Sequence, residues 1–264
     1  MSNSGRFEGL SVMITGATGG FGSRLAELFA GEGASLVLSD YAEDANRALA
    51  DQLRGKGHKV ADLSGDIADE ETARKLVDLA LAEFGQLDIA INNAGIGHKP
   101  ARLPGVDSEE ARRVIDVDLM SVFYCMKHQL PVMEKQFREN GKTSSILNIA
   151  SVAGLIGAPT LSIYAAAKHG VVGLTKTAAL EYARRGVRVN AMCPAWARTA
   201  LVEEGMLGEA DDKKQAEDFL VRGIPMRRVA DPAEITQAML WACDPENTFM
   251  TGHTLAVDGG LTAM

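Results

Sequence analysis

Strand-like and helix-like patterns alternate along the whole chain, and this alternation limits the possible folds more than any other feature. Short apolar runs alternate with longer segments in which apolar residues recur every three or four positions. Such an order predicts a doubly wound α/β fold, with helices on both faces of a parallel sheet. Seven strands are expected, near residues 11–16, 35–40, 58–64, 87–92, 145–150, 188–193 and 254–258. Helices are expected over residues 20–32, 43–55, 69–84, 107–137, 162–185 and 232–243.

The chain length fits one α/β domain spanning residues 1–264, because 46% of the residues are hydrophobic and no linker or internal repeat divides them. Two segments break the alternation. Residues 138–145 are polar and predict a solvated loop. Residues 199–228 contain three glycines and a helical stretch beside the carboxyl end of the sixth expected strand. This segment predicts a substrate lid, with an ordered helical hairpin on the surface as the alternative.

Charge and cysteine content narrow the possible partners and the location. The formal net charge is −8 and no basic block occurs, so neither nucleic acid nor an anionic membrane is an expected partner. The N-terminal segment is polar, and no apolar run approaches the roughly 18 residues of a membrane span. Cys125, Cys193 and Cys243 lie far apart in apolar surroundings, which predicts buried thiols, no disulfide and no metal site. A cytoplasmic location is therefore expected.

A glycine-rich turn joins the first expected strand to the first expected helix. It reads Thr-Gly-Ala-Thr-Gly-Gly-Phe-Gly over residues 15–22, and it includes Gly16, Gly20, Phe21 and Gly22. Such a turn lets backbone N–H groups approach a phosphate, and the helix start adds positive potential. A glycine turn alone is a weak signal. Here the preceding strand, the following helix and the acid Asp40 at the end of the second strand all favour a dinucleotide site.

Ser151, Tyr164 and Lys168 form the second informative pattern. Tyr164 and Lys168 are four residues apart in an Ala-rich run that favours a helix, so they share one helix face. A nearby ammonium favours the phenolate and lowers a tyrosine pKa that is ordinarily about 10. Ser151 follows an apolar run, so its hydroxyl is expected at a strand's carboxyl end, where ligands bind in open α/β sheets. A chance Tyr-x-x-x-Lys on an amphipathic helix is the alternative.

Together these motifs resemble the short-chain dehydrogenase/reductase family, in the family's order and over residues 7–261. The resemblance implies a Rossmann-type fold, a nicotinamide dinucleotide cofactor, and interconversion of a secondary alcohol and a ketone. The matching residues are the glycine turn 15–22, Asp66, Asn92-Asn93-Ala94-Gly95, Ser151, Tyr164, Lys168, the segment 194–199 and Val257-Asp258-Gly259-Gly260.

The resemblance also implies the catalytic roles. Tyr164 would be the general base in alcohol oxidation and the general acid in ketone reduction, while Lys168 would hold the nicotinamide ribose and lower the tyrosine pKa. Ser151 would hydrogen-bond the substrate oxygen. The family commonly has a fourth catalytic residue, an Asn, where this chain has Asp118. An ionised Asp can only accept hydrogen bonds, so a proton relay through Asp118 is in doubt. A second departure is Ala195, where the family usually has glycine.

The cofactor preference follows from Asp40, 24 residues after Gly16. A carboxylate there can accept hydrogen bonds from the adenosine ribose and repels a 2′-phosphate. NADP-preferring members usually place Arg or Lys nearby, whereas Ala17, Thr18, Gly19, Tyr41 and Ala42 are uncharged, so NAD is expected rather than NADP. A simple helix N-cap is the alternative role for Asp40.

The other cofactor residues are assigned by the resemblance alone. Asp66 and the Ile67 backbone would meet adenine, and Asn92 would lie where the fourth strand meets the nucleotide. Ala197 and Thr199 would lie at the nicotinamide, with Thr199 bonding its carboxamide. The alternatives are a plain strand-ending turn for Asn92 and a helix cap for Thr199.

The residues expected around the substrate are mostly apolar, which favours a hydrophobic or cyclic secondary alcohol. Besides Ser151, the candidate substrate residues are His98, Trp196 and Met206, and the wider pocket adds Ile96, Leu155, Ile156, Leu201 and Val202. Each could instead be ordinary packing, and solvent exposure is the alternative for His98 and Arg198. Two other functions stay open: an NADPH-dependent 3-oxoacyl-thioester reductase and a non-catalytic dinucleotide-binding scaffold.

A homotetramer is expected because the family commonly forms one. Apolar residues on the helices 107–137 and 162–185 could form its interfaces, or could face only the sheet of their own subunit. They are Val122, Phe123, Met126, Val171, Val172 and Leu174.

Overall fold

The computed structural model describes residues 5–205, 207–208 and 212–263. Within them, seven parallel strands form one sheet in the order β3-β2-β1-β4-β5-β6-β7, which confirms the predicted fold class. The strands are β1 Ser11–Thr15, β2 Ser35–Ser39, β3 Val60–Asp62, β4 Ile89–Asn92, β5 Ser144–Ile149, β6 Val187–Pro194 and β7 Thr254–Val257.

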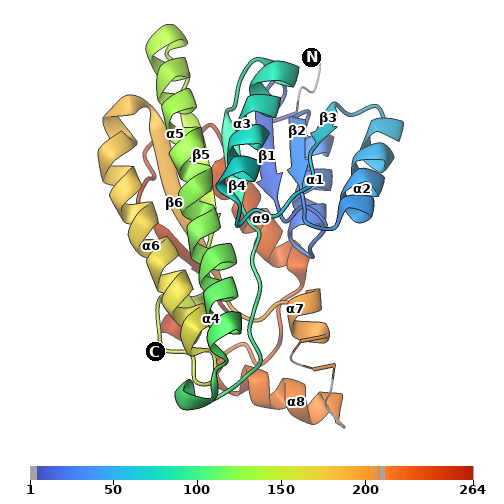
Figure 1. Cartoon of the computed structure of the whole chain (residues 1–264), viewed down its shortest axis with the longest axis vertical. Helices are drawn as coiled ribbons and strands as arrows, with labels where there is room; N and C mark the ends of the chain where they lie inside the picture. The colour runs from blue at the N-terminus through green and yellow to red at the C-terminus, as the bar shows by residue number, and fades with distance from the viewer. Residues whose placement is uncertain (1–4, 206, 209–211, 264) are drawn as a thin grey trace.

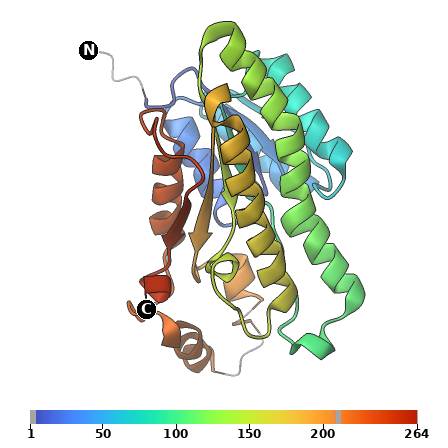
Figure 2. The same ribbon diagram turned by 90° about the vertical axis from the view of Figure 1, so that its left-hand side faces the viewer.

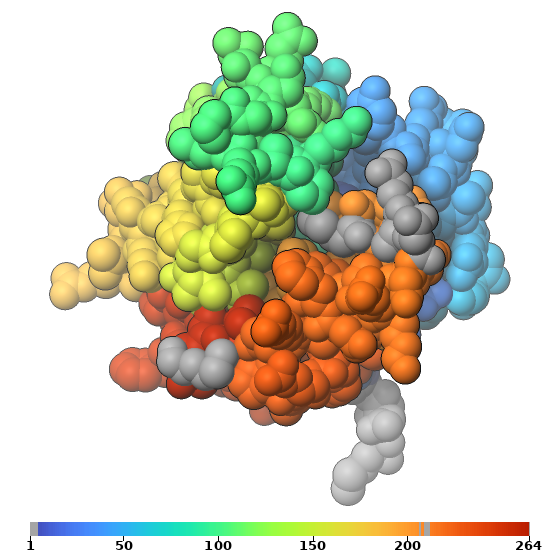
Figure 3. All heavy atoms as spheres, turned by 90° about the horizontal axis from the view of Figure 1, so that it is seen from below, coloured from blue at the N-terminus to red at the C-terminus, as the bar shows by residue number. Residues whose placement is uncertain are grey.

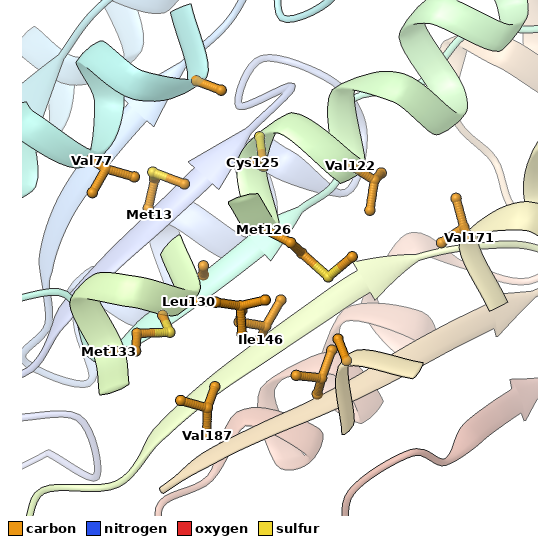
Figure 4. Packing of buried hydrophobic residues seen from close by; sticks show 14 of the residues in the cluster. Met13, Val77, Val122, Cys125, Met126, Leu130, Met133, Ile146, Val171 and Val187 are labelled. Atoms are coloured by element: carbon orange, nitrogen blue, oxygen red, sulfur yellow. The ribbon is translucent and has the colours of Figure 1, made fainter. Parts of the chain in front are cut away.

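Helices cover both faces of this sheet (Figures 1 and 2). On one face, α3, α5 and α6 pack on a cluster that includes Met13, Val77, Met126, Ile146 and Val171 (Figure 4). On the other face, α1, α2 and α9 bury a second cluster. The helices are α1 Gly22–Gly31, α2 Glu43–Gly55, α3 Glu70–Phe84, α4 Ser108–Ile115, α5 Ser121–Asn140, α6 Ser162–Tyr182, α7 Ala200–Glu203, α8 Lys213–Leu220 and α9 Pro232–Cys243.

Residue alternation along β1 explains how one strand serves two cores. Met13 belongs to the first cluster, whereas its neighbours Val12 and Ile14 belong to the second. Successive side chains of a strand point to opposite faces, so a strand buried on both faces is apolar at most of its positions. This is why the strands appear in the sequence as continuous apolar runs. No helix among the described residues is both long and apolar enough to cross a membrane.

The structure corrects two expected elements. The single helix expected over residues 107–137 is two helices, α4 and α5, joined by a π-helical turn at Asp116–Met120. The loop expected over residues 138–145 is shorter, because α5 continues to Asn140 and β5 begins at Ser144. Gly141, with φ of 73°, ends α5 in the left-handed conformation that glycine adopts without strain. The polar residues of 138–140 therefore lie on the last turn of α5.

Candidate active site

A cleft of about 730 Å³ opens at the carboxyl ends of the strands, where the strand order reverses between β1 and β4. Its walls come from the β1–α1 turn, the segments that follow β2, β4 and β5, the start of α6, and residues 194–202. Figure 3 shows this end of the molecule, where the segment carrying α7 and α8 lies beside the segment that follows β5. Ligands of open α/β sheets bind at such a reversal point.

The glycine turn packs closely against the surrounding backbone only because its glycines lack side chains. Gly16 has φ of 63°, and a Cβ there would lie 2.8 Å from the Cα of Ala94. A Cβ on Gly22 would lie 2.0 Å from the carbonyl oxygen of Gly16. The α1 helix begins at Gly22 without a side-chain cap and without an acid in its first turn. These features fit the phosphates of a dinucleotide, which the free backbone N–H groups and the helix dipole favour.

Asp40 lines the cleft and braces the glycine turn. Its Oδ2 accepts a hydrogen bond from the Thr18 amide at 2.9 Å, and its Oδ1 accepts one from the Ala42 amide at 3.0 Å. The alternative role as a helix cap does not apply, since α2 begins after Ala42 with no side-chain cap. Asp40 therefore places a carboxylate beside the glycine turn at the end of β2.

Asp66 and Ile67 also lie in the cleft wall, and the structure adds a residue that the sequence did not indicate. Arg113 of α4 donates two hydrogen bonds to the Asp66 carboxylate, at 2.8 and 3.2 Å. Burial alone would raise the pKa of Asp66, but hydrogen bonds from Arg113 and the Ala68 amide outweigh it and hold the pKa below its usual range. Arg113 is 47 residues away in sequence, so only the fold brings the pair together.

The Asn92 side chain does not line the cleft, and its contact with the cofactor stays a prediction. Its amide lies in a buried network, in which it exchanges hydrogen bonds with Gln129 of α5 at 2.9 and 3.2 Å and donates to Asn148 of β5 at 2.8 Å. Asn148 in turn donates to Thr175 of α6 at 2.9 Å. The cleft wall here is formed by the next residue, Asn93, whose amide donates to the carbonyls of Thr15 and Gly16 at 3.0 Å.

Ala197, Thr199 and Trp196 also lie in the cleft wall. Ala197 bridges to Ala230, which fixes the segment after β6. Thr199 precedes α7, but its side chain accepts no capping hydrogen bond there. A Cβ on Gly20 would lie 2.8 Å from the Thr199 Cγ2, so the turn and the start of α7 pack directly together. The Thr199 side chain therefore touches the glycine turn, with its hydroxyl only 3.5 Å from the Ala197 carbonyl oxygen.

Ser151, Tyr164 and Lys168 meet in the cleft. Ser151 follows β5 and its Oγ accepts a hydrogen bond from the Ala153 amide at 3.2 Å. Tyr164 lies in the first turn of α6, with Lys168 one turn later. The Lys168 Nζ lies 5.5 Å from the centre of the Tyr164 ring and donates a hydrogen bond to the Ile149 carbonyl at 3.1 Å. The arrangement places an alcohol, a phenol and an ammonium around one point.

The protonation of Tyr164 differs from the sequence-based expectation. Burial raises the pKa of Tyr164 above its ordinary value, and the charge of Asp118 adds to that rise. The charge of Lys168 and the hydroxyl of Ser151 lower the pKa, but they do not outweigh burial. Without a bound ligand the phenol therefore stays protonated at neutral pH.

Asp118 lies on the π-helical turn and is fully buried beside Lys168. Its Oδ2 is 3.2 Å from the Lys168 Nζ, and its Oδ1 accepts a hydrogen bond from the Ile96 amide at 2.7 Å. Burial raises the pKa of Asp118 against the opposing effects of Lys168 and Ile96. Burial lowers the pKa of Lys168, but Asp118 and Tyr164 more than reverse this, so the pKa is raised. Asp118 thus favours the charged lysine.

The far end of the cleft is apolar. Ile96, Ile156, Trp196, Leu201 and Val202 line it as expected, and further lining residues are Val152, Leu161, Leu220 and Leu261.

Two expected substrate residues fall elsewhere among the described residues. His98 and Leu155 are not part of the cleft wall. His98 is buried at 5% exposure, so the alternative of solvent exposure does not apply, and its Nδ1 lies 2.9 Å from the Lys99 carbonyl oxygen. Its contact with the substrate stays a prediction. Met206, a third expected substrate residue, lies outside the described residues.

The described parts of residues 199–228 form part of the cleft wall, to which α7 and α8 contribute Leu201, Val202 and Leu220. Arg198 is exposed and pairs with Glu203 at 3.1 Å and with Glu217 at 2.6 Å, so it ties α7 to α8. It is therefore not directed at the substrate.

Most of the apolar residues expected at subunit interfaces face the sheet of their own chain. Val122, Met126, Val171 and Val172 are buried in the first core cluster, and Leu174 packs against it. Only Phe123 of this set is exposed, at 40%. Most of these residues therefore pack within their own subunit and are not available for a subunit interface. The tetramer stays a prediction.

Comparison with known proteins places these features in a family. A family model described as enoyl-(acyl carrier protein) reductase matches residues 16–262. The chain is 38% identical over 256 residues to a 2,5-dichloro-2,5-cyclohexadiene-1,4-diol dehydrogenase of Sphingobium indicum, covering 97% of this chain and 98% of that protein. It is 38% identical over 263 residues to a cyclohexanol dehydrogenase of an Acinetobacter species, covering 100% and 98% of the two proteins.

A solved structure shows the same similarity. The chain matches a 3-ketoacyl-(acyl-carrier-protein) reductase from Brucella melitensis complexed with NADH, with a TM-score of 0.87 and 32% identity. The match covers 97% of this chain and 99% of the other.

Proposed function

Since the chain belongs to the short-chain dehydrogenase/reductase family and interconverts a secondary alcohol and a ketone with a nicotinamide dinucleotide, we propose that NAD is its cofactor and a carbocyclic alcohol its substrate. The observation that carries this proposal is the meeting of Ser151, Tyr164 and Lys168 between a glycine turn and an apolar wall. The glycine turn fits the dinucleotide, and the apolar wall fits a hydrocarbon ring.

The proposed roles follow from the chemistry of the three side chains. A nicotinamide dinucleotide bound in the cleft would supply the hydride chemistry. Ser151 donates a hydrogen bond to the substrate oxygen and stabilises the negative charge that develops there. Tyr164 takes the hydroxyl proton in oxidation and returns it in reduction. Lys168 holds the nicotinamide ribose, and its charge favours the tyrosine phenolate.

The proposed cofactor residues extend along the cleft from the adenosine end to the nicotinamide end. Asp40 would accept hydrogen bonds from the ribose, and Asp66 and Ile67 would meet adenine. The pyrophosphate would rest on the turn that contains Gly16, Gly20, Phe21 and Gly22. Thr199 would hydrogen-bond the carboxamide, and Ala197 would lie beside it at the nicotinamide end. Arg113 fixes the orientation of Asp66 and leaves its carboxylate free to accept a further hydrogen bond.

Replacing Asp40 tests the proposed NAD preference. Asp40→Ala should lower the affinity for NAD by about tenfold, as expected for losing one charge-assisted hydrogen bond. The variant should also discriminate less against NADP. Asp40→Asn is the matched control, because it can still accept the Thr18 amide hydrogen bond but carries no charge. If both variants use NADP better than the wild type does, the negative charge of Asp40 is what discriminates against NADP. Steady-state kinetics with both cofactors measures it, and a higher kcat/KM of the wild type with NADP would exclude NAD preference.

A substrate panel tests the proposed substrate class. Two relatives are named for ring substrates, cyclohexanol and a chlorinated cyclohexadiene diol. With NAD, we expect NADH absorbance to rise with cyclohexanol-type alcohols at a kcat/KM at least tenfold above open-chain secondary alcohols of equal carbon number. A rigid ring loses less conformational entropy than a flexible chain when it enters the apolar wall. Equal rates with both sets would contradict the ring preference.

A 3-oxoacyl-thioester reductase is the second candidate. The name of the Brucella melitensis structure favours it. The description of the matching family model names an acyl carrier protein substrate too, but an enoyl reductase acts on a carbon-carbon double bond rather than on a ketone. The net charge of −8 opposes it, because an acidic carrier protein would be repelled. A higher kcat/KM for a 3-oxoacyl thioester than for any ring ketone in the same panel would decide for this candidate. The meeting of Ser151, Tyr164 and Lys168 in the cleft argues against a non-catalytic scaffold.

The wider organisation is part of the same proposal. Residues 1–264 would form one domain, in which the segment 199–228 acts as a lid that shapes the substrate end of the cleft. The protein would work as a homotetramer in the cytoplasm. The three cysteines fit a reducing compartment, since each is a buried free thiol.

A further inference from the structure

Asp118 is held in place by the backbone as well as by Lys168. The π-helical turn at Asp116–Met120 interrupts the helix where Asp118 projects, and such turns recur at functional sites. The Ile96 amide fixes one carboxylate oxygen at 2.7 Å, and the Lys168 Nζ lies 3.2 Å from the other. Neither side chain of the ion pair is more than 4% exposed. The pair is therefore a fixed and largely desolvated element of the site.

The wall of the cleft lies directly on this ion pair. A Cβ on Gly95 would lie 3.3 Å from the Lys168 Nζ and 3.4 Å from the Asp118 Oδ2, and Gly95 lines the cleft. The Lys168 Nζ donates a hydrogen bond to the Ile149 carbonyl and forms an ion pair with Asp118. An ammonium can donate three hydrogen bonds, so a donor remains for a ligand such as a ribose hydroxyl. Asp118 thus contacts Lys168 rather than the reacting groups themselves, and it acts on them through Lys168.

We infer that Asp118 is a positioning residue that sets the pH range in which Tyr164 can take a proton, by holding a negative charge against Lys168 beneath the cleft wall. This inference rests on the proposed role of Tyr164 as the proton acceptor in alcohol oxidation. An uncharged Asn at this position could hold the same geometry but would not supply the charge.

The sign of the effect follows from the charge of the buried group. With Asp118 ionised, Lys168 charged and Tyr164 protonated, the three side chains are together neutral. Loss of the Tyr164 proton leaves a net charge of −1 in a buried site, which is unfavourable. With an uncharged residue at 118, the same proton loss takes Lys168 and Tyr164 from +1 to neutral, which is favourable. Asp118 therefore delays formation of the phenolate to higher pH.

Other groups that face the pair do not change this sign. Ser151 presents a neutral hydroxyl from the segment after β5. Cys193 of β6 presents a thiol whose pKa is raised by burial to about 11, so it carries no charge at lower pH. Lys168 and Tyr164 titrate as a coupled pair, so the shift belongs to the pair whichever group releases the proton.

The variant Asp118→Asn tests the inference. The acid side of the kcat/KM profile for alcohol oxidation should move to lower pH by about 1 unit, the size expected for one nearby charge. Asp88→Asn is the matched control. Asp88 is also buried and also accepts a backbone amide, that of Ser11 at 2.8 Å, but it precedes β4 at the end of the sheet away from the cleft. Its variant should keep the wild-type profile even if it is less stable.

A second readout does not depend on catalysis. The chain has four tyrosines, so 13C-tyrosine NMR of the full-length protein can follow Tyr164 alone once Tyr164→Phe has identified its signal. The Tyr164 titration should move to lower pH in Asp118→Asn and stay unchanged in Asp88→Asn.

The outcomes separate this inference from the proposed substrate. An unchanged profile and an unchanged Tyr164 titration in Asp118→Asn would overturn the inference, whatever the loss of rate. If no alcohol of the panel is oxidised, the substrate proposal fails, and the NMR titration still decides the role of Asp118.

Discussion

Replacing Tyr164 by Phe is expected to lower the rate of alcohol oxidation by on the order of 10²-fold or more, while NAD binding stays nearly normal. Phe retains the ring that packs in the cleft but has no hydroxyl to receive the substrate proton. Turnover is measured by NADH absorbance and NAD binding by calorimetry.

Tyr182→Phe provides the matched control for this change. Tyr182 ends the same helix, α6, and its ring packs against the Arg185 guanidinium rather than in the cleft. The control variant should keep both turnover and binding. Near-wild-type turnover of the Tyr164 variant would remove the tyrosine from the mechanism.

The second large effect is expected for Lys168→Met, which should lose activity and also stability. Met has a similar length and no charge, so Asp118 becomes a buried carboxylate without its cation. Breaking a buried ion pair in this way typically costs about 3–5 kcal/mol of unfolding free energy. Denaturant unfolding near neutral pH measures this loss, and NADH absorbance measures the loss of activity.

The pH dependence of that stability loss identifies its cause. Burial raises the pKa of Asp118 in the folded protein, so the folded state holds this proton more tightly than the unfolded chain. The penalty should therefore be absent below the unfolded pKa of about 3.9 and grow as the pH rises through the higher folded value. In the double variant Lys168→Met, Asp118→Asn the penalty should be largely removed, while activity stays lost. A stability loss that is independent of pH and of residue 118 would point to packing instead.

The fold could be predicted from the sequence because the strands are apolar runs, and those in the middle of the sheet are buried on both faces. Their continuous apolar runs placed every strand to within two residues of its observed ends. The turn at Asp116–Met120 could not be predicted, since one π-helical turn leaves the helical pattern of apolar residues unchanged. The pairing of Arg113 with Asp66 also has no sequence signal, because it depends on how α4 lies against the segment after β3.

The sequence predicted the site residues that belong to motifs of fixed spacing. It predicted less well those residues whose role depends on the direction in which the side chain points. Ser151, Tyr164 and Lys168 meet as expected. Asn92 and Asn93 are neighbours at a strand end, and successive side chains point to opposite sides, so the motif did not reveal which one faces the cleft. For Tyr164, the sequence showed the nearby lysine charge but not the burial that outweighs it.

The amide network beneath the cofactor cleft restricts how the chain can vary. Asn92, Gln129, Asn148 and Thr175 come from β4, α5, β5 and α6, and each satisfies the buried hydrogen-bonding groups of another. A single replacement by an apolar residue would leave a partner unsatisfied, whereas concerted replacement of partners can be nearly neutral. Substitutions at these four positions should therefore be strongly epistatic. Random drift would be slow there, although none of the four side chains is assigned to the chemistry.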